Sequence, residues 1–410
     1  MSDTTQTISS LSYAVRQQYI PDYIRGAQAP RLYDAYAENG AIPKEYVKGS
    51  TINVNFLSEL PPATTAIPED SDVQATSLVD AQASMGWSSR WNLLRYTEKL
   101  MTQSYTKYGA EAYYAIGQNM MESVDLIARD QATQGALVQR KVARASLAGG
   151  TSTHLLALSN FIDAGADMQT LKVPSFVDAD RSMWLATFHP YALADLLNDT
   201  KIVAVAEYQK ANILFKNEIG ELDRFKLNVS PWAKMFWGAG ADNTTATIAT
   251  TLNGAVVELA ESIVVADATG MVVGGWLTIG TEETAGTHYA TNERVVVTAI
   301  SGTTISIAGE GSNGGVKYAH ATASAVRNAN SVCPVTFGGP QSLAKVYAQD
   351  METNLGDYVG EYGTIVGPNP EGHLKQFVEL GWKYYGNYSR IIETRLYRRE
   401  VAISRDAGQA

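Results

Sequence analysis

A β-rich window in the second half of the chain constrains the fold most strongly. From about residue 242 to residue 328 the sequence consists largely of Val, Ile, Thr, Ala and Gly, with almost no helical periodicity. Strand patterns at Phe225–Val229 and Val332–Phe337 flank the window and are typical of one interrupted unit. We therefore expect residues 242–328 to be an inserted β domain, a small barrel or sandwich. Its short apolar runs are spaced as in such folds: Ile263–Val265, Trp276–Ile279, Arg294–Val297 and Thr304–Ile307.

A second pattern predicts a long helix. After Thr97, a candidate N-cap followed by Glu98, apolar residues recur every three or four positions as far as Ile127. A helix that continued to Asp130 would be about 50 Å long, which exceeds the diameter of a small domain and indicates a structural spine. Gly135 marks a break, and a second helical piece is expected to end at Gly149-Gly150.

The first 48 residues predict a docking arm. Prolines at 21, 30 and 43 divide this tyrosine-rich leader into pieces too short to hold a core. An arm lying across a neighbouring subunit would cover its exposed tyrosines, whereas a loosely docked extension fits the composition equally well. If it is such an arm, deleting residues 1–40 should leave residues 151–403 folded.

Residues 49–96 predict a two-stranded ribbon. Thr51–Phe56 alternates apolar and polar residues, and Ser77–Trp91 supplies a less regular return limb. Between them lies a proline-rich, acidic stretch from Pro61-Pro62 to Asp72, which cannot be a central strand. Because a two-stranded ribbon is only marginally stable in water, it needs a surface on which to pack.

The remaining segments alternate strand and helix patterns. Trp184–Phe188 predicts a buried strand, and His189-Pro190 opens a helix that runs through Leu197. After the β window we expect a helix from about Gln341 to Asp350 and a Gly/Pro loop around residues 366–370. Residues 377–403 predict two long strands joined by a hairpin at Gly386-Asn387.

The charge balance restricts the partners. Only 18% of residues are charged, against about 25% in an average soluble protein, and there are 22 tyrosines, a residue enriched at interfaces. The net charge of −10, half of it from residues 242–328, argues against a dedicated binder of nucleic acid or anionic membranes. The apolar stretch Ile263–Ile279 contains Asp267 and three glycines, so it predicts strands rather than a membrane span.

A search for catalytic motifs finds none that is specific. The five histidines are scattered without metal-ligand spacing, there is no Gly-Lys dipeptide for a phosphate loop, and Cys333 is the single cysteine. Gly309–Gly314 matches the G-x-G-x-x-G pattern, but strand-like sequence follows it, which favours a hairpin loop over a dinucleotide site. Asp178-Ala-Asp180 and Glu69–Asp72 are interpreted as solvated turns. We expect no enzyme activity, no cofactor and no metal.

Several stretches, taken in order, resemble one podophage-type family of tailed-bacteriophage major capsid proteins. Leu32–Glu38 resembles the family's arm opening. Its body motif is matched by Phe188-His-Pro190 with Asp195-Leu-Leu197, and by Leu214–Gly220 with Phe225. Its last segments are matched by Val335–Gly339, and by Gly381-Trp-Lys-Tyr384 through Arg395-Leu-Tyr397.

The resemblance implies an α+β tailed-phage major capsid fold. Its parts would be an N-terminal arm (1–48), an E-loop (49–96), a P-domain spine helix (97–150), an A domain (151–241 and 329–375), the inserted β domain (242–328), and P-domain strands with the C-terminus (376–410). Covalent cross-linking known in some relatives uses a lysine in the E-loop. Residues 49–96 contain no lysine, so that chemistry is not carried over.

The implied function is structural. Such subunits form hexamers and pentamers of an icosahedral shell around double-stranded DNA, assembled in the bacterial cytoplasm. The partners would be a separate scaffolding protein, a portal and, in some such shells, a decoration protein. Contact with the packaged DNA would be weak and non-specific. Three alternatives stay open: a bacterial nanocompartment shell, a β-rich glycan-binding or tail-associated virion protein, and an enzyme with an unrecognised site. The candidate subunit-interface residues are Tyr13, Tyr19, Tyr23, Tyr33, Tyr36, Phe56, Pro61, Pro62, Trp87, Trp91, Arg395, Arg398 and Arg399.

Overall fold

The chain divides into two compact units, which are described separately. Unit 1 contains Ser89–Glu122 and Asp350–Tyr385, and unit 2 contains Ala29–Ser88, Ser123–Gln349 and Gly386–Ala410. The computed structural model describes residues 33–42, 51–57, 60, 62–64, 66, 76–86, 88–103, 108–135, 137–142, 147, 154–178, 181–202, 221–237, 248–280, 291–311, 313–328, 331–348, 351–352, 358–359, 364–371, 374 and 376–404.

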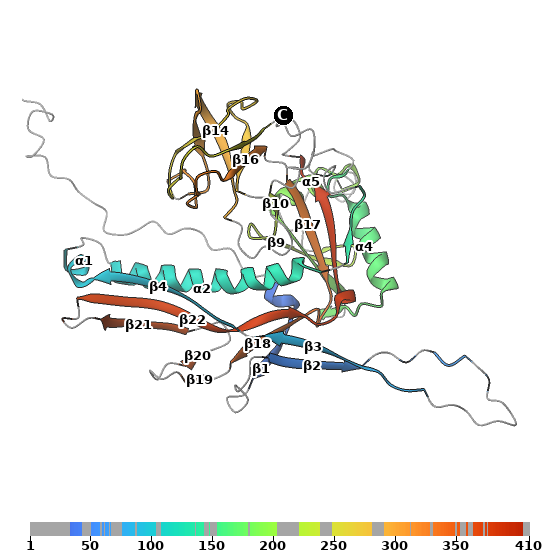
Figure 1. Cartoon of the computed structure of the whole chain (residues 1–410). Helices are drawn as coiled ribbons and strands as arrows, with labels where there is room; N and C mark the ends of the chain where they lie inside the picture. Colours follow the sequence, from blue (N-terminus) through green and yellow to red (C-terminus); the bar gives the residue numbers. More distant parts are fainter. Residues whose placement is uncertain are drawn as a thin grey trace, which may run out of the picture. The chain divides into compact units, whose positions relative to one another are not determined.

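Unit 1 consists of strands and helix. Strands β4 (Ser88–Thr97) and β21 (Thr364–Glu371) both pair with β22 (Phe377–Arg390), whose last residues belong to unit 2. The short helix α1 (Glu98–Gln103) follows β4, and Thr97 caps it by accepting a hydrogen bond from the Leu100 amide at 3.2 Å. Helix α2 (Tyr108–Thr133) begins in unit 1 and ends in unit 2 (Figure 1).

Helix α2 confirms the main part of the predicted spine. It has 26 residues, hence a length of about 39 Å, and its predicted apolar face is buried at Ala112, Ile116, Met120 and Ile127. Of the predicted start, the structure describes the short helix α1, and residues 104–107 between α1 and α2 lie outside the described part. The predicted break at Gly135 is confirmed, since α2 ends at Thr133, and the expected end at Gly149-Gly150 lies outside the described residues.

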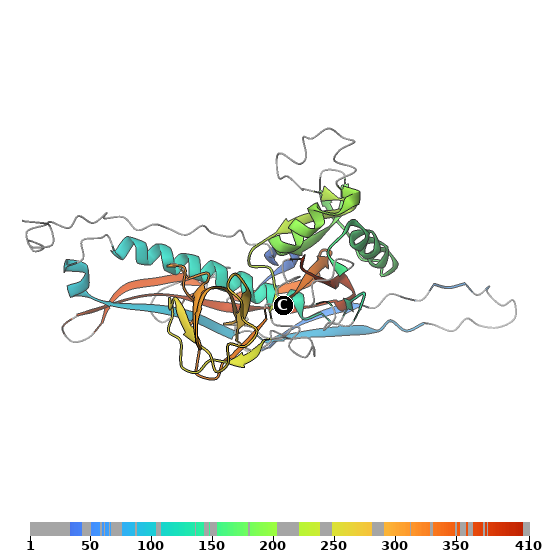
Figure 2. The same ribbon diagram turned by 90° about the horizontal axis from the view of Figure 1, so that it is seen from above.

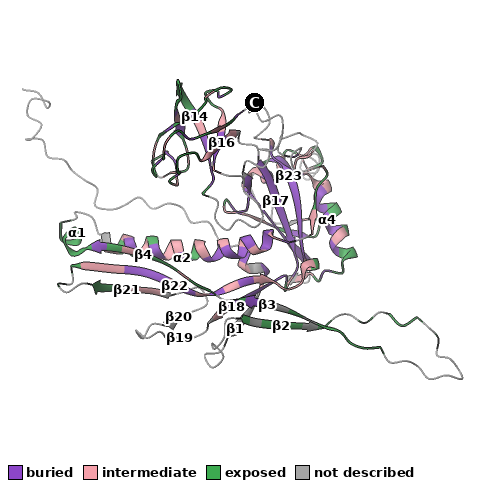
Figure 3. Cartoon of the chain, viewed as in Figure 1, coloured by how far each residue is buried: buried purple, intermediate pink, exposed green. Residues whose placement is uncertain are grey.

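The body of unit 2 is a sheet covered by helices. The sheet order is β5 (Val138–Gln139), β23 (Leu396–Ala402), β17 (Ser331–Gly338), β7 (Arg181–Phe188), β9 (Phe225–Val229) and β8 (Glu221–Leu222), and β6 (Phe176–Asp178) and β10 (Phe236–Trp237) pair at its sides. Strands β17 and β23 are buried along their whole length (Figure 3). β17 and β9 both pair with β7, so the strands on either side of the β window do belong to one sheet, as predicted.

Helix α4 (Leu158–Thr170) packs on this sheet through Phe161, whose ring makes edge contacts with Phe188, Phe225 and Phe337. Helix α5 (Pro190–Leu197) begins as predicted, with His189 as N-cap and Pro190 at the first position. The His189 Nδ1 atom accepts a hydrogen bond from the Tyr191 amide at 3.2 Å. The ring contacts of Phe161 with the three phenylalanines of the sheet form the aromatic core of the body.

The strands predicted in the β window are present and form a closed barrel. Their order is β11 (Ala249–Thr251), β16 (Ala325–Asn328), β13 (Trp276–Ile279), β14 (Glu293–Ser301), β15 (Thr304–Ala308) and β12 (Ser262–Val264). The first and last strands of that order also meet, because the Asn253 amide donates to the Val264 carbonyl and the Ala266 amide to the Thr251 carbonyl, both at 2.8 Å. Figure 2 shows the yellow-to-orange strands curled around a common centre, which is filled by fourteen buried apolar residues.

The ribbon and a small edge sheet complete unit 2. β2 (Thr51–Leu57) pairs antiparallel with β3 (Asp80–Gly86), as the alternation predicted. β1 (Ala37–Ile42) runs parallel to β18 (Leu343–Ala348), which pairs on its other side with the last residues of β22. In unit 1, β19 (Met351–Glu352) and β20 (Tyr358–Val359) form a separate pair. Short 3₁₀ turns occupy Tyr33–Tyr36 and Glu393–Arg395.

Three predictions for the C-terminal third were wrong. Residues 343–348 form β18, not a helix, because partner strands on both sides bury the segment and override its helical propensity. The expected loop at 366–370 lies within β21, as an irregularity of the pairing between Val366 and Asn369. No hairpin forms at Gly386-Asn387, since β22 continues to Arg390 and β23 joins the body sheet instead.

Candidate functional site

The described residues hold no group of three or more His, Cys, Asp or Glu side chains that could bind a metal ion. Two of the histidines have hydrogen-bonded structural roles, as expected: His189 caps α5, and His320 lies 2.6 Å from the buried Glu293. The Gly309–Gly314 segment is a turn, in which the Gly309 amide donates to the Gly314 carbonyl at 2.7 Å, and no helix follows it. Within the described chain, no helix is long and apolar enough to cross a membrane.

The predicted arm is partly a core element of its own subunit. Tyr33 and Tyr36 have exposed fractions of 1% and 0%, so these two rings leave no surface for a neighbouring subunit. The Tyr36 hydroxyl lies 2.6 Å from Thr187 Oγ1 of β7, and the Tyr33 amide donates to Asp125 of α2 at 3.1 Å. Their interface assignment is therefore corrected to a core role. Tyr13, Tyr19 and Tyr23 lie outside the described residues.

A buried ion pair fixes the same segment. Lys345 Nζ, which is fully buried, donates to Asp34 Oδ1 at 2.9 Å, and the Tyr388 hydroxyl donates to the same oxygen at 2.8 Å. A buried ammonium is stable only with a hydrogen-bonded counter-charge, so the carboxylate of Asp34 is needed to stabilise buried Lys345. The segment Tyr33–Ile42 is thereby joined to β18 and β22 through charge as well as through strand pairing.

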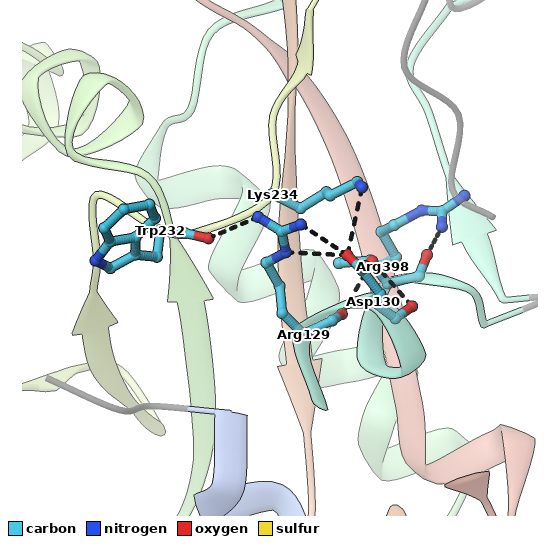
Figure 4. Close-up of polar contacts among 6 residues, drawn as sticks. Arg129, Asp130, Trp232, Lys234 and Arg398 are labelled. Atoms are coloured by element: carbon cyan, nitrogen blue, oxygen red, sulfur yellow. Dashed lines mark hydrogen bonds and ion pairs between the residues drawn. The ribbon is translucent and has the colours of Figure 1, made fainter. Parts of the chain in front are cut away.

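A second polar cluster joins the end of α2 to the body sheet (Figure 4). The carboxylate of Asp130 accepts hydrogen bonds from Arg129 at 2.8 Å and from the fully buried Lys234 at 3.4 Å. Arg129 also donates to the Trp232 carbonyl at 3.2 Å, and Arg398 of β23 donates to the Thr133 carbonyl at the last residue of α2. The cluster holds three chain segments together inside one subunit.

The C-terminal arginines act mainly within the subunit. Arg398 is buried and pairs with Glu400 at 3.2 Å, and Arg399 is buried and reaches Asp163 of α4 at 3.0 Å. Their assignment to the subunit interface is corrected, because both side chains are buried and have partners within the subunit. Arg395 is half-buried and donates to the side chain of Gln341 at 2.8 Å. Sequence alone could not reveal the partner of Arg399, since Asp163 lies more than two hundred residues earlier in the chain.

Exposed apolar side chains lie at one end of the ribbon, where β2 ends and β3 begins. Leu57 closes β2 with 65% of its surface exposed, and Leu60, Leu78 and Val79 beyond the two strands are also exposed. Pro62 is exposed as well. The outward polar residues of the ribbon bond across the strands, from Gln82 to Asn55 and from Ser84 to Asn53, each at 2.8 Å. Pro61, Trp87 and the Phe56 side chain lie outside the described part.

Unit 1 carries an apolar groove. It has a volume of about 300 Å³ and is lined mainly by β4 and β22, with Trp91 and Leu93 on one side and Gly381 and Trp382 on the other. Trp91 is 72% exposed, which is unusual for the largest apolar side chain. A β-carbon on Gly381 would lie 2.7 Å from the Asn92 carbonyl oxygen, so glycine is needed for the close approach of the two strands. Trp91 is thus a sequence-predicted interface residue that lines a groove.

Comparison with solved structures finds similar folds over almost the whole chain. A capsid structure of cyanophage P-SCSP1u matches with a TM-score of 0.56 at 8% identity, covering 98% of this chain and 97% of that one. A capsid structure of Helicobacter pylori bacteriophage KHP30 matches with a TM-score of 0.54 at 6% identity, covering 98% and 99%. The cyanophage Pam1 capsid asymmetric unit gives 0.53 at 12% identity, covering 98% and 100%.

This chain has the fold of these phage capsid proteins. The α+β capsid fold expected from the sequence resemblance is thus confirmed at the level of structure. No protein-family model matches the chain, and no curated protein matches it by sequence.

Proposed function

We propose that the chain is a major capsid subunit, which assembles as hexamers and pentamers into an icosahedral shell around phage double-stranded DNA. The observation that carries this proposal is the match of its fold, from end to end, with capsid structures of several phages. Low charge and many tyrosines agree with a surface that is largely covered by other copies. The shell is virion-located and built in the host cytoplasm with a separate scaffolding protein and a portal.

The exposed apolar side chains of the ribbon and the groove of unit 1 are the proposed contacts between subunits. An isolated two-stranded ribbon gains stability by packing on a second surface, and exposed Leu57, Leu60, Leu78 and Val79 supply the apolar area for that contact. In the groove, Trp91 offers the kind of aromatic anchor that dominates binding energy at interfaces. Residues 1–32 keep the proposed role of an arm across a neighbour.

The barrel is proposed to be a separate domain on the outer face of the shell. Residues 242–328 carry a net charge of about −5, which suits a surface turned away from packaged phosphates. Its own buried core and closed strand order make it independent of neighbouring sheets. Its closed order also leaves no free strand edge for pairing with another chain.

Co-expression with the scaffolding protein of the same phage, followed by electron microscopy and nucleic-acid analysis, tests the proposal. Closed particles of uniform size that package DNA when the portal and packaging enzymes are supplied would support a phage capsid. Particles that instead enclose a protein cargo without scaffold would support the nanocompartment alternative. A monomeric protein under every condition would overturn the proposal.

A further inference from the structure

The barrel touches the body through two cationic side chains. Arg294, at the start of β14, has its guanidinium carbon 5.5 Å from the ring centre of Tyr191 in α5. The Nζ atom of Lys317 lies 4.5 Å from the ring centre of Trp232, in the turn after β9. In both pairs the barrel supplies the cation and the body supplies the aromatic ring, an arrangement that attracts the two partners.

Two of the three basic residues of the barrel lie where it meets the body. Residues 242–328 contain only three basic residues, and two of them, Arg294 and Lys317, make these contacts with the body. In contrast, the acidic residues Glu258, Glu261 and Asp267 are exposed to solvent. Two further acidic residues, Glu293 and Glu310, line the cavity beside Arg294 and Lys317. The barrel, with a net charge of about −5, therefore places two of its three cations at the body, together with two of its acids.

One buried carboxylate, that of Glu293, holds the backbone segment that carries Lys317. Glu293 precedes Arg294, and its side chain accepts hydrogen bonds from the backbone amides of Lys317 at 2.6 Å and Tyr318 at 3.1 Å. The ring of His320 lies 2.6 Å from the same carboxylate. The segment that carries Lys317 is thus fixed to the start of β14, and Arg294 is fixed further by the Trp276 ring 4.4 Å away. The two cations are thus pre-organised for contact with the body, Arg294 with Tyr191 and Lys317 with Trp232.

Between the described strands of the barrel and the described strands and helices of the body, the contact is sparse. A polar cavity of about 110 Å³ separates the two surfaces, with Asn292 and Tyr318 from the barrel and Arg129 and His189 from the body among its lining residues. A cavity of this size and polarity holds a few water molecules, so the two surfaces are not packed against each other by apolar side chains there. The orientation of the barrel therefore depends on a small number of directed contacts.

We propose that Arg294 and Lys317 form a clasp, which holds the barrel against the body in one orientation through Tyr191 and Trp232. The insertion is then a rigid projection of the subunit, with its acidic surface at a fixed place, and not a domain that swings on its linkers. The clasp acts within one subunit, so it operates whether or not the subunit assembles into a shell.

Distance measurement between two spin labels in the full-length subunit tests the clasp. Exposed positions suit the labels: Val273→Cys in the barrel and Ile162→Cys in α4, while the native Cys333 is buried and stays unlabelled. The doubly labelled protein should give one narrow distance distribution. Adding R294A and K317A should replace it by a broad distribution, whereas R327A, which removes the third basic residue of the barrel, should leave it narrow.

The body side of the clasp gives an independent set of variants. Y191L with W232L removes both rings and should broaden the distribution in the same way, with the hydrogen-exchange protection of Val295 and Ile305 in the barrel core unchanged. A narrow distribution with an unchanged mean in the R294A/K317A protein would overturn the proposal. So would a distribution that is already broad before either pair is changed.

Discussion

The ring of Tyr36 occupies the space that a side chain on Gly338 would need. A β-carbon at Gly338 would lie 2.5 Å from two carbons of that ring. Glycine at this position of β17 therefore leaves the space in which Tyr36 packs. Tyr36 is fully buried there, and its hydroxyl contacts Thr187 of the neighbouring strand β7. The segment Tyr33–Ile42 therefore completes the body core rather than extending away from it.

Truncation should distinguish the core segment from the rest of the leader. We expect removal of residues 1–31 to leave the subunit with its cooperative unfolding transition, because the buried rings of Tyr33 and Tyr36 are retained. Removal of residues 1–42 should destabilise it by more than about 3–5 kcal/mol, the cost of deleting one large core aromatic. This replaces the expectation that a deletion of residues 1–40 spares the body. Denaturant unfolding of both proteins is the measurement, and equal midpoints would contradict it.

The Asp130–Lys234 pair should be far more sensitive to change than an exposed pair. Asp130→Ala leaves the ammonium of Lys234 buried near two arginines, and we expect a loss of about 3–5 kcal/mol in unfolding free energy. The matched control is Glu393→Ala, which breaks the partly exposed pair with Arg390 and should cost under about 1 kcal/mol. The double variant Asp130→Leu with Lys234→Met should recover much of the loss. Equal effects of the two single changes would refute this account.

Stability should depend on pH through His189. Burial first, and then the charge of Arg294, lower the pKa of His189 from 6.5 to about 4. Between pH 6.5 and 4 the unfolded chain therefore binds a proton that the folded chain does not. As the pH falls through this window, the free energy of unfolding should decrease by up to about 3 kcal/mol, and below pH 4 this contribution stops changing.

The control for this prediction is His189→Asn, because asparagine also caps helices but does not titrate. The difference in unfolding free energy between wild type and variant, measured from pH 7 to pH 4, isolates the histidine from all carboxylates. A difference that is constant across the window would show that His189 does not carry the effect.

Trp91 should matter for association and not for folding. With 72% of its surface exposed, Trp91→Ala should leave the unfolding midpoint of the isolated subunit unchanged. If its ring is an interface anchor, the concentration needed for assembly should rise by about tenfold or more. Val257→Ala, an equally exposed apolar site in the barrel, is the control and should assemble normally. Light scattering against subunit concentration measures both, and identical curves would remove Trp91 from the interface.

The barrel should be dispensable for shell formation. Replacing Asp242–Asn328 by a short Gly/Ser linker leaves β17 and β9 paired with β7, so the body sheet keeps its continuity. We expect particles still to form, with lower thermal stability. Failure of the shortened chain to fold, shown by loss of its circular-dichroism signal, would mean that the barrel is part of the body core.

The sequence predicted elements well where local pattern and final environment agree. His189-Pro190 opens a helix in any context, and the alternation in Thr51–Phe56 specifies a ribbon strand whose partner lies nearby in the sequence. Prediction was wrong where distant partners decide. Leu343–Ala348 is a strand only because β1, some three hundred residues earlier, pairs with it, and Gly386-Asn387 continues a strand because β18 extends along it.

The same limit applies to the candidate site residues. Tyr33 and Tyr36 are chemically suited to an interface, and nothing near them in the sequence reveals Thr187, Asp125 or Gly338 as their partners. Arg399 likewise reaches Asp163 only after folding. The groove beside Trp91 was missed as a site because the opposing residues of β22 follow nearly three hundred positions later.

Electron microscopy of the purified full-length protein, mixed with its scaffolding protein, tests the central claim most directly. The account expects closed isometric shells of uniform diameter, in which six- and five-fold clusters of this subunit are visible and the barrel projects from the outer surface. The claim would be contradicted if the protein gave only monomers or irregular aggregates while a cooperative unfolding transition showed that it was folded.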